Sequence, residues 1–387
     1  MILDPTEVIK GLREFAETYP LLTNAIAFLG GSASDVYILE PLKRRRERRR
    51  KELEHARLQA TTKAISEGLS GRLFSLAGVT TRIYVLDFSI DGYEPRALVS
   101  HQVSFSDVTP DQYKILYSHH RLRWDALLKA RKIYDGAKGV TPRKVSIDRI
   151  GSAEKKSIRF DFSISPGYVH DRSVCDVFQS LDVPVRQKMV SEPSTTMEPF
   201  FSTGFGVMLS VITSDGLLTF ARRSSSSAIH ASKIVCGVAE LTTEVDVHQK
   251  QFDVYETSRR ALREELGINL QANELYAIEI TACIFDTEYH EWTMLGHIDL
   301  RRLGKQYTSD VLLEYKATAK GHDAWEVADL YFIEFTPSAV AGYIQSHADQ
   351  ILDASKVGAI YALLSVLRDR TAIVEAFGLY QQLAKES

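Results

Sequence analysis

Cysteine is scarce in this chain of 387 residues, which contains only Cys175, Cys236 and Cys283. The three are odd in number, lie far apart and form no C-x-x-C pair, so the sequence suggests neither a disulfide framework nor a zinc site. This usage fits a reducing compartment, and we expect each thiol to be a small buried apolar group. Because the N-terminus also lacks the features of a secretory signal, we expect a cytoplasmic location.

Long apolar runs are lacking as well. The uncharged stretch Tyr19–Ala33 is interrupted by a Gly-Gly pair, and Asp35 follows before the ~20 apolar residues of a membrane span are reached. Clustered arginines follow at Lys43–Lys51, as they do beside a membrane anchor. We expect a buried hairpin and a solvated arginine-rich helix, and contact between Tyr19–Leu42 and a membrane, peripheral or anchored, remains the alternative.

A strong net charge is absent too, since 47 Lys and Arg face 50 Asp and Glu, for a formal charge of −3. The chain as a whole therefore gives no reason to expect a nucleic-acid partner. Lys43–Lys51 is the exception, because eight positive charges in this segment predict weak, salt-sensitive contact with an anionic membrane or a nucleic acid.

The middle of the chain alternates strand and helix signals. Strands are predicted from β-branched and aromatic content, and Pro110 marks the start of a helix that continues through Leu128 to Tyr134. A turn at Asp91-Gly92 joins the first two strands, and Ser165-Pro166-Gly167 ends the last one. The predicted strands are Arg82–Ile90, Arg96–Phe105, Lys144–Ile150 and Lys156–Ile164. Asp171-Arg172-Ser173 follows Tyr168 and either caps a helix or contacts a ligand where two units join.

Residues Phe205–Ile212 are apolar enough for a buried strand, and Ser214-Asp215-Gly216 is a hairpin turn signal. A second strand, Leu217–Ala221, then ends in Arg222-Arg223. Further along, paired strands are predicted at Leu275–Ile284 and Glu291–Ile298.

A helix is predicted around Arg260–Ile268, R-A-L-R-E-E-L-G-I. Residues four apart share a face, so Arg260 lies over Glu264 and can pair with it, while Glu265 projects from the adjoining strip. A buried Leu262–Leu266 side and a left-handed Gly267 would also suit an ordinary amphipathic helix with a glycine C-cap.

This segment closely resembles the second half of the Nudix box, R-E-U-x-E-E-x-G-U with U aliphatic. The family Arg, its paired carboxylates and its closing glycine fall on Arg260, Glu264, Glu265 and Gly267, whereas one acidic position falls on Ala261.

The first half of the box is less regular. Its opening glycine would be Gly237, the spacing to Gly267 is longer than in the family, and the first family Glu corresponds to Glu244 or to Glu240.

The resemblance implies an α/β/α sandwich with a mixed sheet. It also implies a Mg²⁺ or Mn²⁺ ion held by Glu264 and Glu265, with Arg260 orienting Glu264, and cleavage of the pyrophosphate bond in a nucleoside diphosphate-linked substrate. Nudix folds often add a carboxylate after the box, for which Glu326 is the first candidate and Asp323 the second.

Two further features, the Arg222-Arg223 pair and Ala261, bear on substrate binding and catalysis. Arg222 and Arg223 are candidates for phosphate contact, because guanidinium groups suit phosphate, or else they form an exposed strand end. Ala261 and the longer spacing favour an alternative function, a nucleotide-binding or sensor module with weakened catalysis.

The length of the chain allows more than one domain, since single cores stop growing near ~250–300 residues. We predict a helical segment with the basic run at 1–67 and a mixed α/β unit at 68–195. A Nudix-like domain with C-terminal helices is predicted at 196–387.

Overall fold

The structure is a computed structural model. The residues it describes are 73–77, 79–104, 109–131, 133, 136–150, 155–190, 199–225, 227, 230–304, 306–318 and 326–386. The expectations for Tyr19–Leu42, Lys43–Lys51 and Asp323 therefore lie outside the described residues. The chain forms two compact units, Met1–Lys63 and Ala64–Ser387, and the division predicted at residues 195/196 falls inside the second.

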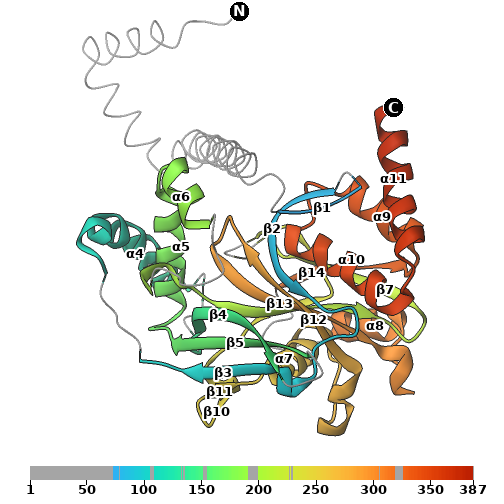
Figure 1. Ribbon diagram of the computed structural model, residues 1–387, viewed down its shortest axis with the longest axis horizontal. Helices are drawn as coiled ribbons and strands as arrows, with labels where there is room; N and C mark the ends of the chain where they lie inside the picture. The colour runs from blue at the N-terminus through green and yellow to red at the C-terminus, as the bar shows by residue number, and fades with distance from the viewer. Residues whose placement is uncertain are drawn as a thin grey trace, which may run out of the picture. The chain divides into compact units, whose positions relative to one another are not determined.

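A nine-stranded mixed sheet is the centre of the second unit (Figure 1). Its strand order is β1-β2-β12-β13-β6-β7-β14, with β8 paired to β7 and β9 paired to β6. Strands β13 and β6 are parallel, and the other strand pairs described in this sheet are antiparallel. The strands are β1 Leu73–Leu76, β2 Val79–Phe88, β6 Phe205–Ile212, β7 Leu217–Arg223, β8 Ile234–Cys236, β9 Val238–Leu241, β12 Ile278–Asp286, β13 Glu291–Asp299 and β14 Val327–Glu334.

Helices pack against both faces of this sheet. All eight residues of β6 are buried, and successive strand residues point to opposite faces. Val207 and Leu209 therefore share one core with α7, whereas Met208 and Ile212 face α10 and α9. These helices and their neighbours are α7 Val254–Leu266, α8 Ser309–Thr318, α9 Pro337–Ser346, α10 Asp353–Leu367 and α11 Arg370–Glu386.

A second, three-stranded sheet has the order β3-β5-β4, with β3 and β5 parallel. Its aromatic side chains complete the core of the large sheet, because Phe160 packs on Phe205 at a ring-centroid distance of 5.0 Å. Its elements and the neighbouring helices and hairpin are β3 Leu98–Gln102, α4 Lys114–Lys129, β4 Val140–Ile150, β5 Lys155–Ile164, α5 Tyr168–Ser180, α6 Val183–Val190, β10 Val247–His248 and β11 Gln251–Phe252.

The described part of the chain is mixed α/β, as predicted. The strand Phe205–Ile212 is confirmed with the same bounds, and the paired strands after the box are β12 and β13. The two strands joined at Asp91-Gly92 are β2 and β3, but they belong to different sheets. The helix after Pro110 begins as the 3-10 turn Asp111–Tyr113 and continues as α4 only to Lys129.

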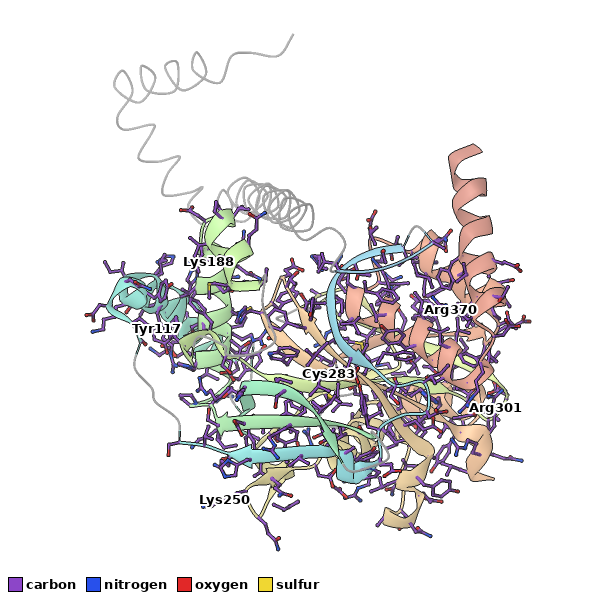
Figure 2. All side chains as sticks on the ribbon, viewed as in Figure 1. Tyr117, Lys188, Lys250, Cys283, Arg301 and Arg370 are labelled. Carbon is purple, nitrogen blue, oxygen red and sulfur yellow. The ribbon has the colours of Figure 1, made fainter. Side chains whose placement is uncertain are left out.

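Cys175, Cys236 and Cys283 are all buried and free, as expected of small apolar groups. Figure 2 shows Cys283 inside the large sheet. Within the described ranges, no helix combines the length and the apolar character needed to cross a membrane.

Candidate functional site

Helix α7 carries the acidic motif and is firmly bounded. Asp253 caps its start, accepting the backbone N–H of Tyr255 at 2.8 Å. Gly267 ends it with φ 69°, the left-handed conformation expected of a glycine C-cap. The apolar side of the helix, including Leu262 and Leu266, is buried in the core beneath β6 and β9. This anchoring fixes the strip that carries Arg260, Glu264 and Glu265.

Arg260 is the hub of an ion-pair network. Its guanidinium lies 2.9 Å from Asp246, 3.1 Å from Glu240 and 3.7 Å from Glu264, measured between the nearest nitrogen and oxygen atoms. It also donates a 2.7 Å hydrogen bond to the backbone carbonyl of Leu241. The pair expected between Arg260 and Glu264 is therefore present, but it is the longest of three.

Asp246 is a partner that sequence reasoning missed. It is buried and forms a capping box with Thr243 at the start of the short helix Glu244–Asp246. The T-x-x-D spacing signals this local cap. The pairing of Asp246 with Arg260 has no such signal, because the two residues come from different elements.

Glu265 is half-buried on the same helix. Its carboxylate accepts a 3.1 Å hydrogen bond from the backbone N–H of Ala239 in β9. Among the described residues, no cation lies within ion-pair distance of it. Burial and then the nearby Glu240 raise the pKa of Glu265 well above its usual value, Glu326 adds to this, and Arg223 opposes it.

Glu240 in β9 stands between Arg260 and Glu265. Burial raises the pKa of Glu240 to about 7, although the charge and hydrogen bond of Arg260 act in the opposite direction. The other candidate, Glu244, is exposed and accepts a 3.4 Å hydrogen bond from the backbone of Lys138. Of the two glutamates considered for the first half of the box, the structure thus brings Glu240 to the motif.

The remaining candidate ligands are engaged by arginines. Glu264 lies 2.6 Å from the Arg263 guanidinium, and Glu326 lies 3.0 Å from that of Arg223. The charge of Glu326 nevertheless reaches Glu265. In the part of the chain that is described, no three His, Cys, Asp or Glu side chains are grouped so that they could hold a metal ion as they stand.

The two arginines at the end of β7 are separated by the sheet, because adjacent strand residues point to opposite faces. Arg222 donates a 2.8 Å hydrogen bond to the Tyr331 hydroxyl and lies over that ring, on the side of α9. Arg223 points to the other face, where its charge acts on Glu265. Only Arg223 therefore joins the acidic motif.

Ala261 is 1% exposed and packs in the apolar core with Leu262. The position that carries a carboxylate in the Nudix pattern thus contributes only a methyl group here. The region around α7 gathers Arg223, Arg260 and several carboxyl groups, so side chains of both charge signs lie close together there.

Comparisons with known proteins do not identify a family for this chain. No protein-family model matches the chain, and no curated protein matches it. One solved structure with partial similarity is DR0079 from Deinococcus radiodurans. It is 17% identical over 37% of this chain and 74% of its own, with a TM-score of 0.24. A likeness of this size supports no conclusion about fold or function.

Proposed function

We propose that residues 196–387 form a Nudix-like α/β/α sandwich and that the chain hydrolyses the pyrophosphate bond of a nucleoside diphosphate-linked substrate with a divalent metal ion. One observation carries the proposal. Glu265 lies half-buried beside Glu240, on the helix that carries the E-E-x-G motif, with a single backbone donor and no cation within ion-pair distance among the described residues. A carboxyl group in such surroundings is costly to ionise unless a cation compensates it.

The carboxyl groups suit Mg²⁺ or Mn²⁺ in kind, since these hard cations prefer oxygen ligands. Glu265, Glu264 and Glu326 would hold the ion. Glu264 would give up its ion pair with Arg263, and Glu326 its ion pair with Arg223, in order to bind the metal. When bound, the metal would polarise a phosphoryl group and lower the pKa of a water molecule.

The chain's own residues have separate tasks in this proposal. Arg260 holds Glu240 and Glu264 in place through its ion pairs. A metal ligand must be the ionised carboxylate, and burial raises the pKa of Glu265, so metal affinity should rise with pH. Arg223, released from Glu326, would contact a phosphate oxygen with its planar guanidinium.

The test is a screen of nucleoside diphosphate sugars, dinucleotides and nucleoside triphosphates with Mg²⁺ or Mn²⁺, with analysis of the products. For a substrate that is cleaved, Glu265→Gln should reduce turnover by about 100-fold or more and weaken Mn²⁺ binding in calorimetry. Gln can still accept the hydrogen bond from Ala239, so the fold should be kept.

Glu256→Gln is the matched control. Glu256 lies on the same helix and pairs with Arg259 at 2.5 Å, away from the motif. It should keep full activity and full metal affinity. Undiminished turnover of Glu265→Gln at limiting Mg²⁺ would contradict the assignment.

A second candidate function is a nucleotide-binding or sensor module without efficient hydrolysis. The specific observation in its favour is Ala261, which is buried in the core at the position of a family carboxylate. The same screen separates the two functions. Binding of a nucleotide that persists in EDTA, with no product formed under any metal condition, would support the module and reject the hydrolase.

A further inference from the structure

His230 lies where several cationic side chains from separate parts of the fold come together. Its ring meets that of Tyr289, which lies in sequence between the partners of Arg82 and Arg172, and its backbone carbonyl accepts the N–H of Lys233, whose own carbonyl accepts the N–H of Arg223. The cationic side chains are Arg82 in β2, Arg172 in α5, Arg223 in β7, and Lys233 directly before β8. Burial, followed by the charges of these four residues, lowers the pKa of His230 to about 3. The imidazole is therefore neutral near pH 7, because burial disfavours its charged form and the nearby cations would repel a further positive charge.

The four cations differ in how far they are neutralised. Arg82 is engaged by two carboxylates, forming a short ion pair with Glu288 and a 3.1 Å pair with Asp353. Its charge is consequently balanced inside the protein, and it has little left to offer a ligand.

Arg172 and Arg223 each have one carboxylate partner. Arg172 is 4% exposed and forms a short ion pair with Glu291, and Arg223 lies 3.0 Å from Glu326. In both guanidinium groups the Nε atom is buried and has no hydrogen-bond partner within the described residues. A buried donor without an acceptor is unfavourable, so a ligand oxygen that accepts from these two Nε–H groups would be stabilised.

Lys233 has no carboxylate within ion-pair distance among the described residues. Its ammonium group donates a 2.6 Å hydrogen bond to the backbone carbonyl of Asp349. Burial lowers the pKa of Lys233, and the positive charge of Arg82 lowers it further. Its two remaining N–H donors can be given to an anionic ligand.

Aromatic rings support two of these groups. The guanidinium of Arg172 lies over the Tyr168 ring at 5.7 Å, and the ring of His230 meets that of Tyr289 edge-on at 4.7 Å. The rings limit the freedom of Arg172 and His230, so their donors are ordered before a ligand binds.

We propose that Arg172, Arg223 and Lys233, with His230 beside them, form an anchor for a phosphate group of the ligand. Arg223 connects this anchor to the proposed catalytic helix, since its charge acts on both His230 and Glu265. The inference rests on the proposed function and extends it. It gives α5, from the part of the chain with no assigned role, a direct share in substrate binding.

The probe is inorganic pyrophosphate, titrated calorimetrically into the full chain in EDTA, so that no metal contributes. Lys233→Gln should weaken pyrophosphate binding about tenfold, and Arg223→Gln by at least as much, because each removes a charged donor. Lys250→Gln is the control, since Lys250 is exposed in the turn between β10 and β11 (Figure 2) and should leave the affinity unchanged.

Arg172→Lys tests the contribution of α5 while keeping a cation for the half-buried Glu291. It should weaken pyrophosphate binding, because Lys lacks the Nε donor and the planar fork of Arg. Circular dichroism establishes whether each variant is folded. If the Arg172 variant is unfolded, the pyrophosphate affinity of Lys233→Gln tests the anchor instead.

The outcomes separate this inference from the proposed function. Unchanged pyrophosphate affinity in the folded Lys233 and Arg223 variants, or no pyrophosphate binding by the wild type, would overturn the anchor even if Glu265→Gln abolishes hydrolysis. Loss of pyrophosphate binding in these variants would establish the anchor even if the wild type hydrolyses nothing.

Discussion

Replacing Glu240 with Gln should change how the stability of the protein depends on pH. Burial raises the pKa of Glu240 from 4.5 to about 7. Between these values the folded state holds a proton that the unfolded state has released, so stability falls as pH rises through this window. Gln carries no proton to lose, so the variant should escape this part of the decline.

The size of the effect follows from the shift. One pKa unit corresponds to about 1.4 kcal/mol, so a rise from 4.5 to about 7 gives an upper limit of about 3 kcal/mol. The side chain is 22% exposed, and Gln also gives up the ion pair with Arg260, so we expect about 1–3 kcal/mol.

Urea unfolding of the wild type and Glu240→Gln at pH 5 and pH 8 measures this difference. The variant should gain about 1–3 kcal/mol relative to the wild type between the two pH values. Glu244→Gln is the control, because Glu244 is exposed, and its stability should follow the wild type at both.

Parallel pH profiles for the wild type and Glu240→Gln would refute the reasoning. They would mean that Arg260 stabilises the Glu240 carboxylate as much as burial destabilises it. If a metal binds at Glu265, saturating Mn²⁺ should also shrink the wild-type penalty at pH 8, because a nearby cation favours ionised carboxylates.

Two further changes test the frame of the site by urea unfolding. Gly237→Ala should cost more than about 3 kcal/mol, because φ is +74° and the added methyl would lie 2.0 Å from a backbone carbonyl of β6, whereas Gly216→Ala, with φ +83° and open space, should cost about 1–2 kcal/mol. Equal losses would show that strain at φ alone sets the cost. Arg260→Met should cost about 3–5 kcal/mol, because it leaves the buried Asp246 without its cation, and Arg259→Met, at a partly exposed pair, no more than about 1 kcal/mol. A loss for Arg260→Met as small as that for Arg259→Met would mean that water already compensates Asp246.

Local signals in the sequence predicted the elements around the site well. The run Phe205–Ile212, apolar except for Ser210, gives β6 its bounds, because a strand buried on both faces needs no alternation. The placement of Gly267 after a Leu262–Leu266 stripe gives the end of α7. These features depend on residues close together in the chain.

Side chains whose partners are distant in the chain were harder to place. Counting from Gly237 could not choose between Glu240 and Glu244, because the register is set by the pairing of β9 with β6 and not by spacing along the loop. The alternation of a strand could have separated Arg222 from Arg223. No pattern pointed to the four cations near His230, which come from separate elements.

The pairing of β2 with β12 has a consequence for the synthesis of the chain. The two strands are about 200 residues apart in sequence, so at a typical elongation rate β2 leaves the ribosome about 10–40 s before β12. Until then the edge of β2 that β12 will cover has unpaired backbone groups. During this interval the exposed edge of β2 is open to pairing with other chains. Arg172 is also synthesised before Arg223 and Lys233, so the proposed anchor is incomplete for part of the same interval.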